Sequence, residues 1–162
     1  ELAHLPHRSF EQSEKLNEFQ GGMARDFEEI EEGTLQSDCM REACLVFKRA
    51  NDLPDSQEVE IHQMRVITVG EETPVAPEGI HQDGFDCIAM IGIDRHNIEG
   101  GELMVYESKE SNPTLISGLK RGQMVMLDDH KMWHDASPIE RLDKLKDGHG
   151  DWLVFCAKVK HE

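Results

Sequence analysis

The clearest apolar pattern in the chain predicts a helix between residues 38 and 51. Along this stretch apolar side chains recur three, four and seven positions apart, which gathers them on one face of a helix: Met40, Ala43, Cys44 and Phe47. Asp38 is the predicted N-cap, because a short polar side chain there can accept a hydrogen bond from the first helical amides. Pro54 prevents the helix from continuing. We therefore predict one amphipathic helix in the first third of the chain.

The residues before this helix carry weaker patterns. Residues 9–19 indicate a short helix with Ser9 as its cap, and the glycine pair after it would end that helix. Residues 23–30 alternate weakly between apolar and polar positions, which indicates an edge strand. Residues 31–33 form a predicted turn.

From residue 59 onward the apolar period becomes that of strands. In residues 59–68 the side chains alternate between two faces, so Gln63 and Arg65 share one face and His62 lies on the other. A loop over residues 70–79 follows, and its length is typical of functional loops. Further strands are predicted around His81 and His134 and at the following ranges: 87–93, 102–106, 114–117, 123–127 and 152–159. Many short strands with Gly-rich turns predict a mainly β fold, either a sandwich or a barrel.

Length and charge limit the classes of function. The 162 residues suffice for one domain, so we expect residues 1–162 to form a single unit. The chain begins at Glu1 rather than at Met, and we expect an N-terminal portion to be missing. A formal net charge of −16 argues against a nucleic-acid partner, because phosphates would be repelled. No apolar run is long enough to predict a membrane span.

The cysteines point to the cellular compartment. None of the four forms a Cys-x-x-Cys pair, and three of them lie in apolar patterns. We interpret them as reduced thiols of the core, which is typical of a cytoplasmic protein.

The most distinctive chemistry lies at His81 and Asp83. On an extended strand these two side chains point to the same side, and His134 follows His81 by 134 − 81 = 53 residues. Two histidines and one carboxylate form the facial triad of non-haem iron(II) oxygenases, which leaves positions open for a cosubstrate and dioxygen. The alternative is a chance His-x-Asp pair in a chain with 9 His and 33 acidic residues.

Several segments, in this order, resemble the iron(II)/2-oxoglutarate dioxygenases related to bacterial isoleucine 4-hydroxylase and the biofilm-stress proteins grouped with it. The matching segments are residues 21–27, 61–65, 77–84, 95–101, 127–129 and 134–139. The resemblance implies a double-stranded β-helix (a cupin-like jelly roll) with one or two flanking helices, and iron(II) held by His81, Asp83 and His134. It also implies conversion of 2-oxoglutarate to succinate and hydroxylation of a small molecule, most simply a free amino acid.

One position departs from the family pattern. The family binds the far carboxylate of 2-oxoglutarate with an Arg in a Gly-x-Arg-Asp pattern, and Gly150 stands at that position here. Another cation can take this role, and Arg141, Lys158 or Arg65 are candidates; Gln63 shares a face with Arg65 and completes the predicted cosubstrate site with Arg65 and Arg141. Alternatively, the protein uses a different cosubstrate or none, or it is a metal- or ligand-binding jelly roll without 2-oxoglutarate turnover.

Two acidic pairs near the predicted ligands have less definite roles. Asp86 and Asp135 flank ligand positions and could orient the ligating side chains, or they could be solvated surface acids. Asp128 and Asp129 are interpreted as a turn at the rim of the cavity.

Overall fold

The computed structural model of this chain describes residues 2–6, 8 and 27–159. The helix predicted over residues 9–19 and the first half of the strand predicted over residues 23–30 lie outside them. Residues 27–30 are not part of a strand, so the second half of that prediction is wrong. A short helix, α1 (Glu32–Leu35), replaces the predicted turn.

The amphipathic helix is confirmed as α2 (Asp38–Ala50). Its cap is Ser37 rather than Asp38, because the Ser37 hydroxyl accepts a hydrogen bond from the amide of Met40 at 3.2 Å. Asp38 instead lies in the first turn, where a negative charge is favoured by the helix dipole. Within the described residues, no helix is long and apolar enough to cross a membrane.

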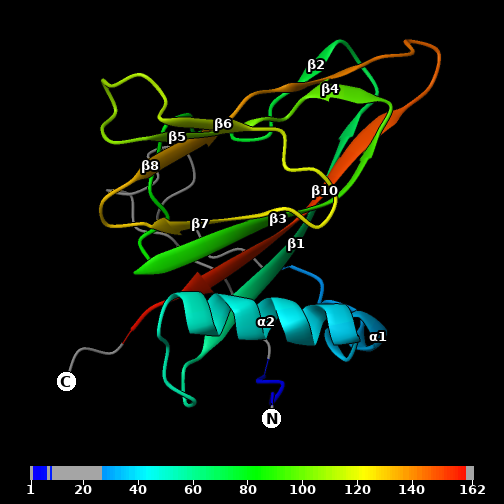
Figure 1. The fold of residues 1–162 in the computed structure, drawn as a ribbon. Helices are drawn as coiled ribbons and strands as arrows, with labels where there is room; N and C mark the ends of the chain where they lie inside the picture. Colours follow the sequence, from blue (N-terminus) through cyan, green and yellow to red (C-terminus); the bar gives the residue numbers. More distant parts are fainter. Residues whose placement is uncertain (1, 7, 9–26, 160–162) are drawn as a thin grey trace.

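The rest of the described chain is built from short strands arranged in three antiparallel sheets (Figure 1). The sheets have the orders β1-β10-β3-β7, β2-β9-β4 and β6-β5-β8. The strands are β1 (Val59–Thr68), β2 (Glu72–Thr73), β3 (Cys87–His96), β4 (Ile98–Gly100), β5 (Leu103–Tyr106), β6 (Leu115–Ser117), β7 (Met124–Asp128), β8 (Trp133–Ala136), β9 (Ile139–Arg141) and β10 (Gly148–Ala157).

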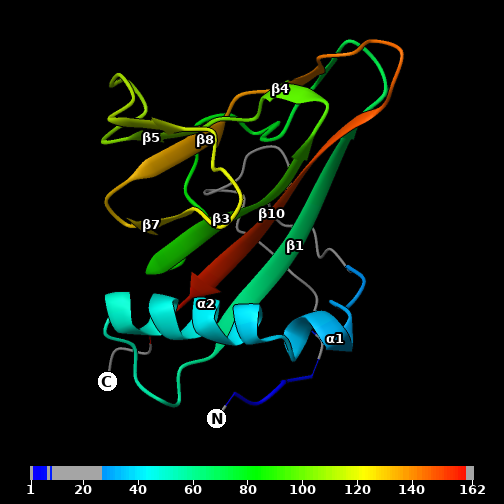
Figure 2. The same ribbon diagram turned by 45° about the vertical axis from the view of Figure 1, so that its right-hand side comes forward.

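The four-stranded sheet has apolar residues on both faces, and each face packs against a different layer. Helix α2 runs across the outer face, as the two views in Figures 1 and 2 show. There the fully buried rings of Phe47 in α2 and Phe155 in β10 meet edge to face, with 5.8 Å between their centroids. Cys87, Ala89 and Leu153 belong to the same cluster. This packing explains the apolar stripe of α2.

The inner face of the sheet packs against the two smaller sheets. Ile88 of β3 and Trp152 of β10 contact Leu103 and Val105 of β5 and the fully buried Ile139 of β9 within one cluster. Two layers of antiparallel strands therefore enclose the inner core, which confirms the predicted mainly β jelly-roll architecture with flanking helices.

The orientation of β1 corrects an expectation that matters for the site. Val59 and Ile61 pack on the outer cluster, whereas Val66 packs on the inner one. Strand alternation therefore directs Gln63 and Arg65 outward, away from the space between the layers. The hypothesis that these two side chains point into the cavity is therefore wrong. Alternation along a strand separates its two faces, but it does not show which face the second layer covers.

The described thiols are free, but they are not all part of the core. Cys87 and Cys156 are buried, Cys44 is half-buried and Cys39 is exposed. Burial raises the pKa of Cys87 to about 11, which makes this thiol unreactive at neutral pH.

Candidate metal centre

His81 and His134 are brought together by the backbone. The amide of each residue donates a hydrogen bond to the carbonyl of the other, and both bonds are 2.9 Å long. This antiparallel bridge joins the segment before β3 to strand β8. The two imidazole rings lie 4.3 Å apart between centroids. The bridge fixes the two rings relative to each other although 52 residues lie between them in the sequence.

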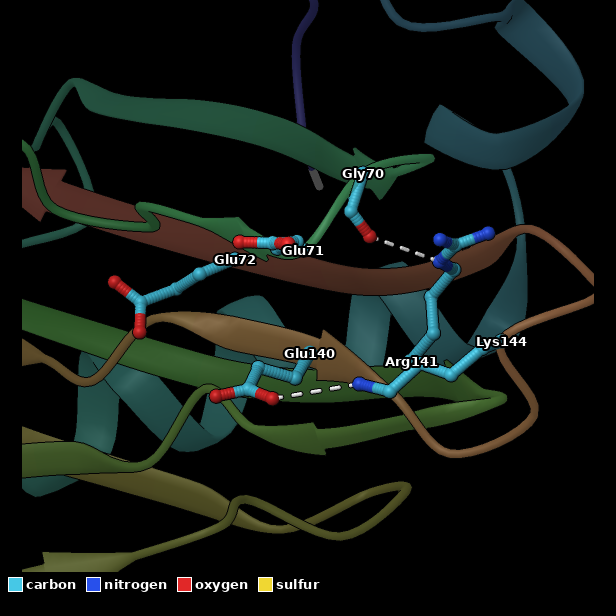
Figure 3. A pocket seen from close by; sticks show the side chains of 6 residues that line it. All are labelled: Gly70, Glu71, Glu72, Glu140, Arg141 and Lys144. Atoms are coloured by element: carbon cyan, nitrogen blue, oxygen red, sulfur yellow. Dashed lines mark hydrogen bonds and ion pairs between the residues drawn. The ribbon is translucent and has the colours of Figure 1, made fainter.

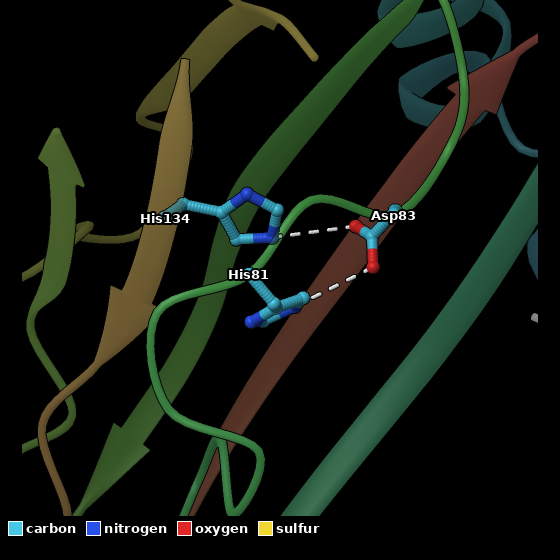
Figure 4. Close-up of side chains that lie close together, drawn as sticks. All are labelled: His81, Asp83 and His134. Atoms are coloured by element: carbon cyan, nitrogen blue, oxygen red, sulfur yellow. Dashed lines mark ion pairs between the residues drawn. The ribbon is translucent and has the colours of Figure 1, made fainter. Parts of the chain in front are cut away.

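Asp83 completes the group (Figure 4). One of its oxygens, Oδ1, lies 3.5 Å from Nε2 of His81, and Oδ2 lies 3.3 Å from Nε2 of His134. Ligand atoms from the three side chains all lie within 4.8 Å of one another. Both histidines are buried, at 7% and 5% exposed. The structure therefore brings together the three residues that the sequence predicted as a metal site.

The route to this geometry differs from the predicted one. Residues 82–86 form a loop rather than a strand, so alternation along a strand does not align His81 with Asp83. Asp129, which is 1% exposed, holds the loop instead. Its carboxylate accepts hydrogen bonds from the amides of Asp83 at 3.2 Å, Gly84 at 2.7 Å and Phe85 at 3.1 Å. Gly84 also has a positive φ of 88°, which glycine adopts without strain.

The charges at the centre favour an ionised ligand at Asp83. Burial raises the pKa of Asp83, but the hydrogen bonds from His134 and His81 outweigh burial and hold that pKa well below its usual range. Burial lowers the pKa of His81, but the carboxylates of Asp83 and Glu78 outweigh it and raise that pKa to about 9. Burial and the charge of Asp83 raise the pKa of Asp129.

The nitrogen atoms that face Asp83 are available as ligands. Nδ1 of His81 lies 2.7 Å from the carbonyl of Gly79, which can only accept, so this nitrogen keeps its proton and Nε2 is the nitrogen that can release its proton to bind a metal. Among the residues that the structure describes, Nδ1 of His134 has no hydrogen-bond partner, and it lies 3.9 Å from Oδ1 of Asp129. Two imidazole nitrogens and one carboxylate thus converge from a buried, rigid frame, and this donor set fits a divalent metal such as iron(II).

Two contributors at this centre were not predicted as such from the sequence. Asp129 was interpreted as part of a rim turn, although its position after the apolar residues 124–127 is a signal that it follows a buried strand. Glu78 lies 3.4 Å from Nε2 of His81, and only its place three residues earlier pointed to it. Asp86, which was considered as a residue that orients a ligand, contacts other groups. Its oxygens lie 2.8 Å from His130 and 2.6 Å from the amide of Val159.

The predicted cosubstrate residues do not join the triad. Arg65 makes two hydrogen bonds of 2.7 Å to the carboxylate of Asp151 on the outer face, and Gln63 is exposed there. Arg141 donates to the carbonyl of Gly70 at 3.0 Å in a surface pocket of about 580 Å³ that also holds three glutamates (Figure 3): Glu71, Glu72 and Glu140. Lys158 is exposed. Lys144 also lines this pocket and pairs with Glu140, but the three glutamates outnumber the two cations, so the net charge of the lining is negative and opposes binding of a dianion by Arg141.

A second group of potential ligands lies on the outer face. Nε2 of His149 is 3.3 Å from Asp94 and 3.9 Å from Asp151. Asp94 is exposed and Asp151 is bound to Arg65. This group was not predicted as a site from the sequence.

A family comparison identifies the class of protein. The family model described as 2OG-Fe dioxygenase matches residues 1–156. The chain belongs to this dioxygenase family. No curated protein matches the sequence.

Several solved structures share the fold of this chain. This chain is 28% identical to a bsmA homolog from Methylobium petroleophilum PM1, with a TM-score of 0.77 over 95% of this chain and 64% of that one. IDO (isoleucine dioxygenase) from Bacillus thuringiensis shares the fold at 15% identity, with a TM-score of 0.72 over 85% of this chain and 64% of that one. The Fe(II)/(alpha)ketoglutarate-dependent dioxygenase TqaL shares the fold at 20% identity, with a TM-score of 0.61 over 85% and 59%. The chain thus spans about two thirds or less of the length of these relatives.

Proposed function

We propose that this chain carries the metal centre of an iron(II)- and 2-oxoglutarate-dependent dioxygenase that hydroxylates a small molecule. The convergence of His81, Asp83 and His134 within 4.8 Å carries the proposal, because it supplies the donor set of a facial triad in a chain of the 2OG-Fe dioxygenase family. When bound, iron and 2-oxoglutarate would supply the oxygen chemistry, with decarboxylation to succinate. The protein's own residues position and shield these groups.

The roles of the three residues follow from their surroundings. His81 would bind through Nε2, since its Nδ1 proton is held by the carbonyl of Gly79. Asp83 would bind as a carboxylate, and Asp129 fixes the loop that carries it. His134 would bind through Nε2, the nitrogen that already faces Asp83. Burial of both histidines limits access of water to the centre.

We further propose an amino acid as the substrate. A pocket of about 330 Å³ is lined in part by Gly79, two residues before His81, and by Asp135, directly after His134. Asp135 and Glu72 place two carboxylates in this lining, which suits the ammonium group of a free amino acid. The name of the isoleucine dioxygenase with the same fold motivates the same class.

The test of the function is binding followed by turnover. Under anaerobic conditions, 2-oxoglutarate should raise the melting temperature of the iron-loaded protein and produce the metal-to-ligand absorption band. With oxygen and a panel of free amino acids, succinate should form in proportion to a hydroxylated amino acid, whereas the corresponding acids without an amino group should be poor substrates. Metal binding without any 2-oxoglutarate binding would replace this proposal by a metal-binding jelly-roll module.

A further inference from the structure

A guanidinium group points into the inner core from strand β3. Nη1 of Arg95 donates to the carbonyls of Gly118 at 3.1 Å and Gly101 at 3.4 Å, and Nη2 donates to the carbonyl of Gly100. A side chain built at Gly101 would meet Nη1 of Arg95 together with Ile139 and the ring of Trp152. Both of these belong to the inner cluster. Arg95 is therefore half-buried between the two layers, unlike the outward-facing Arg65.

The hydrogen bonds of Arg95 leave one edge of its guanidinium unused. The edge formed by Nε and Nη2 of an arginine can bind a carboxylate, as Arg65 shows. Its Nε and Nη2 donate to the two oxygens of Asp151, each at 2.7 Å. In Arg95 the three carbonyls are bound through Nη1 and Nη2, so Nε and one of the two Nη2 protons remain unused. Within residues 2–6, 8 and 27–159, no carboxylate pairs with Arg95. Burying a cation without an anionic partner costs free energy. The chain has 33 acidic residues that could have supplied such a partner.

Arg95 lies where it can replace the arginine that is absent at Gly150. In the sheet, Arg95 lies directly opposite Gly150 on the neighbouring strand. A Cβ atom on Gly150 would lie 2.1 Å from the indole ring of Trp152, so that ring occupies the space which a side chain at position 150 would need. A guanidinium from β3 thus reaches the inner core at the level where β10 offers no side chain.

The path of the chain limits how far Arg95 can lie from the metal centre. The amide of Gly101, beside Arg95, bonds to the carbonyl of Pro138 at 3.1 Å, and Pro138 follows His134 by four residues. Four residues of extended chain span at most about 14 Å. The side chains of His134 and Arg95 both extend into the space between the layers, which shortens the separation that a five-carbon diacid would have to bridge between the metal and the guanidinium.

We infer that Arg95 binds the far carboxylate of 2-oxoglutarate through its Nε and Nη2 atoms. The inference rests on the proposed function, and it makes Arg95 the cosubstrate-binding cation in place of Arg65 or Arg141. The three backbone carbonyls hold the guanidinium plane in a fixed orientation, so that little conformational entropy is lost when the diacid binds. The bidentate edge selects a planar carboxylate over a neutral group of similar size.

The test compares two arginine variants in the iron-loaded protein without oxygen. Arg95→Gln should weaken 2-oxoglutarate binding about 30-fold or more, and Arg95→Lys should weaken it about tenfold, because a point charge replaces the bidentate edge. Arg65→Gln, on the outer face, is the matched control and should bind 2-oxoglutarate like the wild type. Binding of 2-oxopentanoate, which lacks the far carboxylate, should be weak in the wild type and unchanged in the Arg95 variants. Metal content, measured separately, should remain the same in all variants.

The outcomes separate this inference from the proposed function. If the wild type prefers 2-oxoglutarate to 2-oxopentanoate and both Arg95 variants keep that preference, Arg95 is not the cation and the proposed function stands. If the wild type holds metal but binds neither oxoacid, the proposed function fails and the inference fails with it. Because Arg95 also bonds to three carbonyls, folding is checked by circular dichroism. Where Arg95→Gln does not fold, the conservative Arg95→Lys variant decides by its loss or retention of the preference.

Discussion

Two groups of histidine and aspartate side chains in this protein have the same ligand chemistry and different surroundings. His81, Asp83 and His134 lie between the two layers, whereas Asp94, His149 and Asp151 lie on the outer face of the four-stranded sheet. In each group, ligand atoms lie within 4.8 Å of one another. The shortest contacts of the two groups are also equal, at 3.3 Å. Proximity alone therefore does not distinguish them.

Burial and the partners of the carboxylates do distinguish them. The carboxylate of Asp83 faces two imidazoles, which can yield their Nε2 positions to a metal, and its loop is held by the buried Asp129. The carboxylate of Asp151 is held at both oxygens by Arg65, a permanent cation that opposes a second cation. A His-Asp group becomes a plausible metal site when its carboxylate is rigid and has no arginine partner. We expect one metal ion per chain, at the inner group.

The largest effect is expected from removing a ligand of the inner group. Asp83→Ala should lower iron affinity by more than about 100-fold and abolish succinate formation, because second-sphere changes alone typically cost 10–100-fold. His81→Ala should behave in the same way. Asp94→Ala, in the outer group, is the matched control. Metal content by mass spectrometry and coupled succinate assays provide the measurements, and normal turnover by the Asp83 variant would show that the site is wrongly assigned.

A smaller effect is expected from loosening the loop without touching a ligand. In Asp129→Asn, an amide must replace a carboxylate that accepts three backbone hydrogen bonds, and its NH₂ group cannot accept any of them. Iron affinity should fall about 10–100-fold, with the three ligands still present. Asp128→Asn, at the more exposed neighbouring position, should leave the affinity unchanged. Equal affinities of the two variants, measured by titration calorimetry, would argue against a positioning role for Asp129.

A still smaller effect is expected from breaking the ion pair of the outer group. Arg65→Gln removes both hydrogen bonds to Asp151, so we expect the melting temperature to fall on the order of 2 °C. Iron content should remain at one ion per chain. A second ion in the variant would contradict this expectation and would show that Arg65 alone excludes metal from the outer group.

The smallest effect is expected at the exposed end of the outer group. Asp94→Asn should change the free energy of unfolding by less than about 0.5 kcal/mol and leave the metal stoichiometry unchanged, because exposed pairs contribute little. His149→Ala serves as a second probe of the same cluster. The contrast would be broken if the wild type held two metal ions and either variant held one.

The residues show which parts of the fold were readable from the sequence. Helix α2 was predictable because its apolar spacing repeats with the helical period, and only its cap was misplaced by one residue, from Ser37 to Asp38. The strand-rich remainder was predictable because alternation and glycine turns recur along it. The three candidate ligands were predictable because His81 and Asp83 lie two residues apart and the segments around all three residues resemble the dioxygenase family.

Other features needed contacts between segments far apart in the chain. Arg65 and Val66 alternate along β1, but only α2 and the inner layer decide which of them faces the core. Asp129 was not recognisable as a loop anchor, because its hydrogen bonds reach residues more than 40 positions away. Arg95 was not considered as a cosubstrate residue, because its orientation depends on the pairing of β3 with β10.

The sequence by itself determined the type of chemistry: two imidazoles and a carboxylate, local periods that form one helix and many strands, and a missing side chain at Gly150. Tertiary structure alone decided which side chains meet. Whether a side chain can bind a metal depends on one residue, and the period of apolar positions depends on neighbouring residues. Both can therefore be predicted from the sequence. Whether a cation such as Arg65 or Arg95 faces the surface or the metal centre depends on which layer covers each face of the sheet, and that is a property of the packed whole.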